Sequence, residues 1–189
     1  MFNLKIIIAS TRPGRKGPAI ASWIISKASK LKDFQFEVLD LAVINLPMMD
    51  EPAHPRFKTY QNQHTKDWSA KIESADAFIM VTPEYNYSLP APLKNAIDYL
   101  SLEWGYKPVA FVSYGGMAGG TRAVQMLKQV VTSLKMMPIV EAVNVPFFLK
   151  YIDDNGKFNS DETLEKAADA MFTELLRWTK GLKSVREDR

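Results

Sequence analysis

Short apolar runs that alternate with amphipathic stretches constrain the fold of this chain more than any other sequence feature. In the clearest case, residues 77–81 are apolar throughout, as in a strand that is buried on both faces. Between Leu93 and Leu100, apolar residues then recur at i, i+3, i+4 and i+7, which is the spacing of one helix face. Repetition of this unit predicts a parallel sheet with helices on both faces and right-handed crossovers.

The same patterns give the extent of each element. We predict strands over residues 4–9, 34–41, 77–81, 108–114 and 137–145. We predict helices over residues 18–28, 60–73, 92–100, 122–134 and 160–180. Residues 42–57 contain Pro47, Pro52 and Pro55 and are expected to be irregular, and the charged tail from Lys183 is expected to be loose. The 189 residues are therefore expected to form a single domain, 1–189.

Composition excludes several classes of function. The chain has no cysteine, which rules out disulfides, thiolate metal sites and a cysteine nucleophile. His54 and His64 pair with no nucleophile or ligand set in the sequence, so we predict surface roles for both and no metal site. Positive charge is scattered and no aromatic RNA motif accompanies it, so nucleic-acid binding is not expected. No apolar run approaches the roughly 20 residues of a membrane helix, and we expect a cytoplasmic protein with no membrane association.

The loop after the first predicted strand, residues 10–18 (STRPGRKGP), has the composition of an anion-binding turn. A strand, a Gly/Ser/Thr-rich turn and a helix together place an anion at the helix N-terminus, where backbone N–H groups and the helix dipole bind it. Arg12 adds a charged donor. The loop matches neither the dinucleotide fingerprint nor the Walker A pattern. An ordinary polar loop fits the spacing equally well, and both interpretations remain open on spacing alone.

Two further loops follow central strands and carry unusual residues. Residues 82–90 place a carboxylate, an amide, two rings and a hydroxyl after the third strand. Residues 115–121 (GGMAGGT) follow the fourth strand, and glycine lets the backbone approach a flat ligand closely. In the strand order 2-1-3-4-5, strands 1, 3 and 4 are neighbours, so the three loops meet at the edge where open α/β sheets bind ligands. A phosphorylated planar heterocycle would suit all three loops.

Three motifs give the chain a resemblance to a known family: IIIASTRPGRKGPAIASWI (residues 6–24), TPEYNYSLPAPLKNAIDYLS (82–101) and VSYGGMAGGTRAVQML (112–127). On these motifs it resembles the NADPH-dependent FMN reductase family of flavodoxin-like proteins, which includes quinone, azo-dye and chromate reductases. The resemblance implies a flavodoxin-like three-layer α/β/α sandwich with a five-stranded parallel sheet of order 2-1-3-4-5. It also implies bound FMN, NADPH as electron donor, and quinones or other small oxidised molecules as acceptors.

The resemblance further implies a site. In that family the first loop holds the FMN phosphate, the second flanks the isoalloxazine ring and the third covers its pyrimidine end. Carried over to this chain, the cofactor-binding residues are Ser10, Arg12, Gly17, Pro18, Ala19, Pro83, Glu84, Tyr85, Asn86, Ser113, Gly115 and Gly116. Ala9 stands where many members have glycine, and residues 14–17 lack a serine that some members have. More of the phosphate contact is therefore left to Arg12 and to backbone N–H groups.

No catalytic side chain is implied, because the flavin carries the chemistry. Glu84 is either an acid in the reaction or a loop carboxylate that pairs with a neighbour, and the roles of Tyr85 and Tyr87 toward the second substrate are open. Arg15 and Lys16 are either contacts for a 2′-phosphate or solvated loop charges, so the preference for NADPH over NADH is open as well.

Alternatives to a reductase also remain. A flavodoxin-type electron carrier would have the same fold, but such carriers tend to be acidic and this chain has a net charge of +3. A non-catalytic flavin-binding module is a third possibility. Members of the family are typically dimers. Residues 92–104 are apolar on more than one side, through Tyr99, Leu102 and Trp104, which favours a homodimer or a tetramer, with simple core packing as the alternative.

Overall fold

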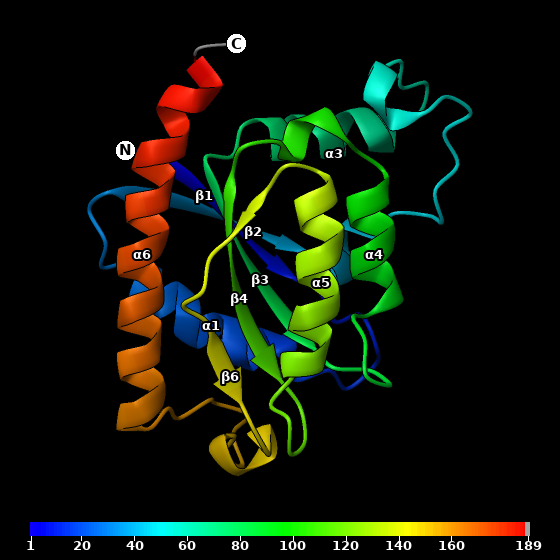
Figure 1. Cartoon of the computed structure of the whole chain (residues 1–189). Coiled ribbons are helices and arrows are strands. Elements are labelled where there is room, and N and C mark those ends of the chain that lie inside the picture. The colour runs from blue at the N-terminus through cyan, green and yellow to red at the C-terminus, as the bar shows by residue number, and fades with distance from the viewer. Residues whose placement is uncertain (188–189) are drawn as a thin grey trace.

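The apolar runs of the sequence form one parallel sheet in the computed structural model, which describes residues 1–187 (Figure 1). Its strands are β1 (Phe2–Ile8), β2 (Phe34–Asp40), β3 (Ala77–Pro83), β4 (Pro108–Tyr114), β5 (Met137–Pro138) and β6 (Val143–Val145). The order β2-β1-β3-β4-β5 confirms the predicted flavodoxin-like topology. In this register Ile8 lies opposite Val81 and Pro83 lies opposite Tyr114, so the loops after β1, β3 and β4 leave the same edge.

The predicted last strand, residues 137–145, is wrong as a single element. It is two short strands that both pair with β4, Met137 opposite Pro108 and Val143 opposite Val112. Pro138 has no N–H to donate to the ladder, and the chain leaves the sheet at Val140, which is 80% exposed, before it returns at Val143.

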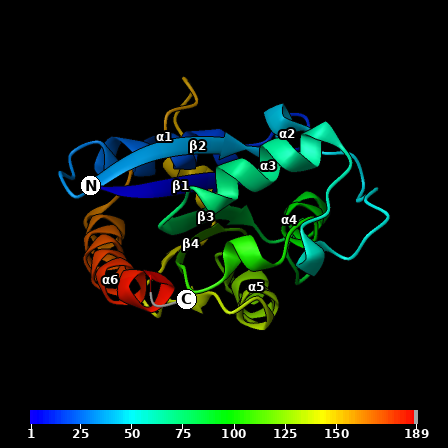
Figure 2. The ribbon, with the colours of Figure 1, turned by 90° about the horizontal axis from the view of Figure 1, so that it is seen from above.

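Six α-helices accompany the sheet within residues 1–187. They are α1 (Gly17–Ala28), α2 (Leu41–Ile44), α3 (Gln63–Glu73), α4 (Ala91–Asp98), α5 (Thr121–Ser133) and α6 (Glu162–Glu187). Helices α1 and α6 cover one face of the sheet, and α3, α4 and α5 cover the other, which gives the three layers that were predicted (Figure 2). No helix within residues 1–187 is both long and apolar enough to cross a membrane.

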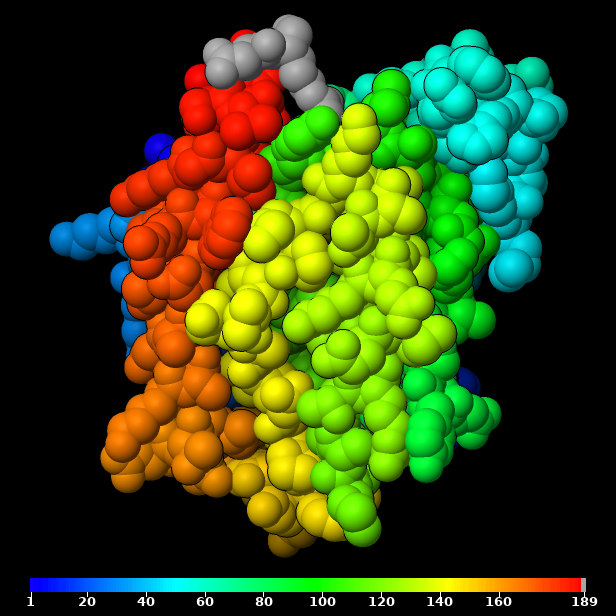
Figure 3. Space-filling view, viewed as in Figure 1, coloured from blue at the N-terminus to red at the C-terminus, as the bar shows by residue number. Residues whose placement is uncertain are grey.

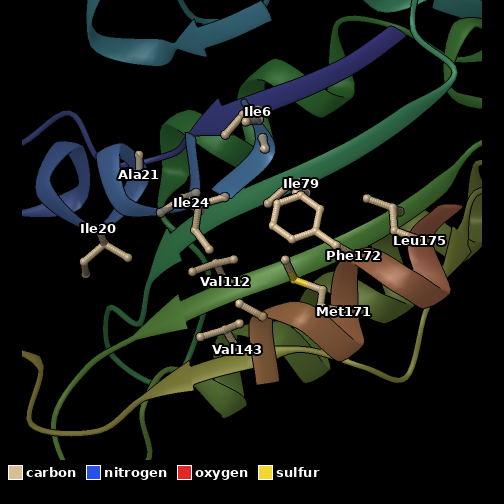
Figure 4. Packing of buried hydrophobic residues seen from close by; sticks show 14 of the residues in the cluster. Ile6, Ile20, Ala21, Ile24, Ile79, Val112, Val143, Met171, Phe172 and Leu175 are labelled. Carbon is tan, nitrogen blue, oxygen red and sulfur yellow. The ribbon is translucent and has the colours of Figure 1, made fainter. Parts of the chain in front are cut away.

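Each face of the sheet has its own hydrophobic core. On the first face Ile6, Ile79 and Val112 of the strands pack against Ile24 of α1 and Met171 of α6 (Figure 4). Burial of a branched or sulfur-containing side chain of this size contributes about 1.5–3 kcal/mol, so the two clusters hold the strands in a fixed register. That register is what places the three loops at one edge.

The second core contains the aromatic residues that were considered for a subunit interface. Tyr99 and Trp104 are fully buried within the chain itself, and the Trp104 ring packs 5.1 Å from the Phe78 ring. Only Leu102 of the three is exposed, at 55%. Core packing therefore explains Tyr99 and Trp104, and the argument for an interface that rested on them is wrong.

The segment that was expected to be irregular, residues 42–57, contains α2 and a short 3₁₀ helix, η1 (Pro55–Phe57). Hydrogen bonds attach this segment to α4 and its C-terminal end. Asn95 Nδ2 and the Tyr99 hydroxyl donate to the Pro47 carbonyl at 2.7 and 3.1 Å. His54 accepts a hydrogen bond from the Arg56 N–H. His64 Nε2 lies 2.9 Å from Asp50 Oδ1, which belongs to this segment. Neither histidine belongs to the loops that follow β1, β3 and β4.

The tail prediction is wrong as far as the structure describes it. Helix α6 continues to Glu187 along one flank of the molecule, drawn in orange and red in Figure 3, and residues 188–189 lie outside the described part. Arg186 fastens this end, because it donates to Asp76 Oδ1 at 2.8 Å and to the Tyr106 carbonyl at 2.9 Å. These partners are 80 or more positions away, which is why local charge did not reveal them.

Replacement of Arg186 by alanine is expected to lower the free energy of unfolding by about 2 kcal/mol, since two hydrogen bonds from a charged group that is only 16% exposed are lost. Urea denaturation measures the change. Arg177→Ala on the same helix is the matched control: that side chain is 81% exposed and its pair with Glu174 is long, at 3.4 Å, so a change below about 0.5 kcal/mol is expected. Equal effects of the two replacements would show that Arg186 anchors nothing.

Candidate functional site

The loops after β1, β3 and β4 surround a cavity of about 260 Å³ at the carboxyl edge of the sheet, the lower end in Figure 1. Its lining includes these predicted site residues: Arg12, Pro83, Glu84, Tyr85, Gly115 and Gly116. Ser10 and Gly17 are buried, beside Tyr114 of the lining, and Pro18 and Ala19 form the first turn of α1. Asn86 is exposed on the second loop, and Ser113 is buried in β4. The fold thus brings most of the predicted cofactor-binding residues to one place.

The start of α1 leaves donors open at this cavity. Lys16 occupies the N-cap position without a side-chain hydrogen bond to the helix, and Pro18 stands in the first turn. The Ser10 hydroxyl lies beside this turn, is 1% exposed and has no hydrogen-bond partner among the described residues. A buried hydroxyl without a partner costs free energy, so the geometry favours a ligand that would satisfy it.

Gly17 makes the space around that hydroxyl. A Cβ atom at Gly17 would lie 2.3 Å from Ser10 Oγ and 2.8 Å from the Tyr114 hydroxyl oxygen. Both distances are far below van der Waals contact, so no other residue fits without displacement of these groups. The first turn of α1 therefore approaches the two hydroxyls as closely as a backbone can.

Arg12 and Arg15 have different environments although both lie on the first loop. Arg15 binds Asp40 in a bidentate pair at 2.5 and 2.6 Å and donates to the Ser10 carbonyl at 2.8 Å. The hydrogen bonds that Arg15 donates to Asp40 hold the pKa of Arg15 above its ordinary value. Asp40 also caps α2 by accepting from the Ala42 N–H. Arg15 thus ties the loop to the end of β2, whereas Arg12 is exposed and carries no ion pair in the described residues.

The second loop is a tight turn. Tyr85 and Ser88 exchange two backbone hydrogen bonds of 2.9 Å, and the residues between them, Asn86 and Tyr87, have φ of +49° and +68°. Positive φ at both central positions is the pattern of a type I′ turn, which asparagine tolerates and tyrosine adopts at a cost. Tyr87 is held there by the Arg122 guanidinium, which lies 4.1 Å from the centre of its ring.

Glu84 is the predicted site residue with the clearest structural role. Its carboxylate accepts from Arg122 Nη1 at 2.9 Å and from the Arg122 N–H at 3.2 Å, in the first turn of α5. An acidic side chain at this position is stabilised by the helix dipole. The interpretation of Glu84 as a loop carboxylate that pairs with a neighbour is thus the one that the contacts support.

The third loop presents backbone rather than side chains. Ser113 Oγ lies 2.8 Å from the Gly119 carbonyl oxygen and 2.9 Å from Asn144 Oδ1, so this hydroxyl holds the loop and is turned away from the cavity. A Cβ on Gly115 would lie 3.2 Å from the Gly120 nitrogen, but nothing would lie within 4 Å of one on Gly116. The loop therefore offers a bare, accessible peptide at Gly116 beside the cavity.

Taken together, these features fit a ligand with an anionic end and a flat body. The unpartnered Ser10 hydroxyl, the uncapped start of α1 and Arg12 suit a phosphate. The turn at Tyr85, the exposed peptide of Gly116 and the aromatic rings in the lining leave a slot that suits a planar ring.

The sequence model of one family matches residues 2–150 of the chain, and its description is NADPH-dependent FMN reductase. The chain belongs to this family. A family relative in Schizosaccharomyces pombe, an NAD(P)H-dependent FMN reductase, is 43% identical over 148 residues, which are 76% of this chain and 74% of that protein. Another NAD(P)H-dependent FMN reductase, from Saccharomyces cerevisiae, is 39% identical over 77% of this chain and 82% of its own length.

Further relatives were found by comparison of structures and of sequences. The structure of a flavoenzyme NAD(P)H:acceptor oxidoreductase from Paracoccus denitrificans superimposes with a TM-score of 0.74 at 19% identity, and covers 96% of this chain and 98% of that one. An NAD(P)H:quinone oxidoreductase of Solanum tuberosum is 44% identical, over 50% of this chain and 48% of that protein. The first of these likenesses supports the flavodoxin-like sandwich, and the second extends the relatives of the family to quinone reductases.

Sequence reasoning missed three side chains of this family member's site. Tyr114 and Phe148 line the cavity, with ring centres 5.1 Å apart, and Arg122 organises the second loop. Tyr114 ends an apolar strand and looked like core, and Phe148 comes from a segment after the predicted sheet. A usable signal was present only for Tyr114, since a polar aromatic as the last residue of a central strand points to the ligand-binding edge.

Proposed function

We propose that this chain is an NAD(P)H-dependent oxidoreductase that binds FMN at the carboxyl edge of its sheet and reduces quinones or other small oxidised acceptors. Membership of the NADPH-dependent FMN reductase family supports the activity. The observation that carries the site is the buried Ser10 hydroxyl without a partner, beside the uncapped first turn of α1.

Each part of the site has a distinct task. Ser10, Arg12 and the Gly17 N–H hold the phosphate, since Pro18 has no N–H and the Ala19 N–H already donates to the Lys16 carbonyl at 3.1 Å. The loop Pro83–Asn86 flanks one side of the ring. Because the Gly115 N–H already donates to the Val145 carbonyl at 3.2 Å, donors of the third loop toward the ring come from Gly116. When bound, FMN supplies the hydride chemistry that no side chain of this chain can supply.

No general acid or base is needed from the protein. Glu84 is engaged by Arg122, and no cluster of three or more His, Cys, Asp or Glu residues suited to a metal exists within residues 1–187. The chain thus acts by binding, by orientation of the ring and by leaving one side of the slot open to NAD(P)H and then to the acceptor. We further propose a homodimer or tetramer in the cytoplasm, with NADPH as donor.

A preference for NADPH over NADH requires a cation that contacts the 2′-phosphate, and few cations are available at this site. Arg15 is committed to Asp40, so the proposed contact for a 2′-phosphate falls to Lys16, which is exposed. The basic net charge of +3 favours a reductase over a flavodoxin-type carrier, because such carriers use acidic surfaces to dock redox partners.

Turnover with and without FMN tests the proposed function. Protein loaded with FMN is mixed with NADPH and a water-soluble quinone, and NADPH consumption is followed. FMN-loaded protein is expected to turn over and FMN-free protein is not. Protein that binds FMN yet consumes no NADPH would favour the carrier or the non-catalytic module.

Replacement of Arg12 by alanine is expected to weaken FMN binding by about 1.5–3 kcal/mol, the contribution of a hydrogen bond to a charged group. This corresponds to an increase in Kd of about 10- to 150-fold, measured by quenching of flavin fluorescence. Arg56→Ala, on η1 and outside the cavity lining, is the control and is expected to leave the Kd unchanged. An unchanged Kd for Arg12→Ala would remove Arg12 from the phosphate set.

A further inference from the structure

The side chain of Tyr114 reaches from the end of β4 to the start of α1. Its hydroxyl oxygen lies 2.8 Å from the position of a Cβ on Gly17, and Ser10 Oγ lies 2.3 Å from the same point. A hydroxyl from the loop after β1 and a hydroxyl from the last residue of β4 therefore meet at Gly17, the first residue of α1. The pair lies beside the phosphate site proposed above, and the sequence pattern did not predict Tyr114 as part of it.

The hydroxyl of Tyr114 is not explained by packing. The ring packs edge-to-face against Phe148 at 5.1 Å and the residue is 3% exposed, an environment that a phenylalanine would fill equally well. The neighbouring Ser10 Oγ is buried and has no hydrogen-bond partner among the described residues, which carries a desolvation cost. A ligand that accepts hydrogen bonds from both would remove that cost.

The surrounding charges favour an anion as this ligand. Arg12 and Lys16 line the same cavity as Tyr114 and form no ion pair within the described residues. The other charges of the lining are neutralised, because Arg15 pairs with Asp40 and Glu84 pairs with Arg122. Burial, opposed by the neighbouring Ser10 hydroxyl, raises the pKa of Tyr114 to about 12. The side chain therefore stays protonated and able to donate at neutral pH.

We propose that the Tyr114 hydroxyl is a binding group for the phosphate of the cofactor and acts together with Ser10 Oγ. This inference rests on the proposed function, since it assumes that FMN occupies the cavity. It assigns to the end of β4 a role in binding the phosphate, in addition to the backbone role of the loop that follows.

A comparison of FMN with riboflavin tests the proposal, because the two differ only in the phosphate. Apo-protein carrying Tyr114→Phe is titrated with each ligand and the quenching of flavin fluorescence gives both Kd values. We expect the Kd for FMN to rise about tenfold and the Kd for riboflavin to stay within about twofold of the wild-type value. Ser10→Ala is expected to behave in the same way. The double variant should lose less than the product of the two effects, since both hydroxyls serve one phosphate.

Other outcomes separate the possible failures. An unchanged Kd for FMN, or an equal rise for FMN and riboflavin, would overturn the role of Tyr114 at the phosphate while the proposed function stood. Wild-type protein that binds neither flavin would overturn the proposed function itself. Inorganic phosphate provides a readout without flavin: it should raise the melting temperature of the wild type more than that of Tyr114→Phe, and equal shifts would count against the proposal.

Discussion

Replacement of Gly17 by alanine is expected to raise the Kd for FMN by at least about tenfold and to abolish the yellow colour of the protein as purified. The added Cβ would lie 2.3 Å from Ser10 Oγ and 2.8 Å from the Tyr114 hydroxyl oxygen, so one methyl group displaces both. Overpacking at such a site costs about 1–3 kcal/mol. Here the cost falls on the groups that we assign to the phosphate, and riboflavin binding should change less than FMN binding.

The matched control for this prediction is Gly181→Ala. Gly181 lies in α6, and a Cβ there would meet nothing within 4 Å. Alanine is the better helix former by about 1 kcal/mol, so this variant should be at least as stable as the wild type and bind FMN normally. If Gly17→Ala bound FMN as tightly as Gly181→Ala, the close approach of α1 to the two hydroxyls would have no part in binding.

Stability of the protein is expected to rise with pH above neutrality because of Lys107. The residue is 4% exposed, and its ammonium group donates to the Ile72 and Glu73 carbonyls at 2.8 and 2.9 Å, at the end of α3. Burial lowers the pKa of Lys107 from 10.5 to about 8. The unfolded chain therefore holds this proton more tightly than the folded one, and the folded state gains stability as pH rises from about 8 to about 10.5.

The size of this effect is measured against Lys107→Met, which has no titrating group at that position. Between about pH 7.5 and about pH 9.5, the unfolding free energy of the wild type should rise by about 2 kcal/mol more than that of the variant. Urea denaturation at the two pH values measures the difference, and the other titrating groups cancel because both proteins carry them. Parallel pH curves for the two proteins would show that Lys107 is an ordinary lysine in the folded state.

The parts of this fold that depend on local pattern were predictable, and those that depend on distant partners were not. Apolar runs gave β3 and β4 because these central strands are buried on both faces, and the edge loops followed from the order of the strands. The break after Pro138 had a local signal, a missing N–H within a predicted strand, that was outweighed by the apolar run. The extension of α6 to Glu187 had none, because its anchors are Asp76 and Tyr106.

In the site, too, features that depend on local sequence were predictable and features that depend on distant partners were not. Ser10, Gly17 and the glycines after β4 lie on loops whose sequence already indicated a ligand. Arg15 is bound to Asp40, whereas Arg12 forms no ion pair within residues 1–187, and this difference could not be predicted from a loop that contains both. The position of the Tyr114 hydroxyl beside Gly17 depends on two sheet registers at once, and no single motif contains that information.

The most direct test of the account is the response of the FMN-loaded protein to NADPH in the absence of oxygen. The visible absorption band of the bound flavin should disappear on addition of one equivalent of NADPH and return when a quinone is added. A band that NADPH leaves intact, but that dithionite removes, would contradict the account, because it would describe a protein that holds a reducible flavin and does not accept electrons from NADPH.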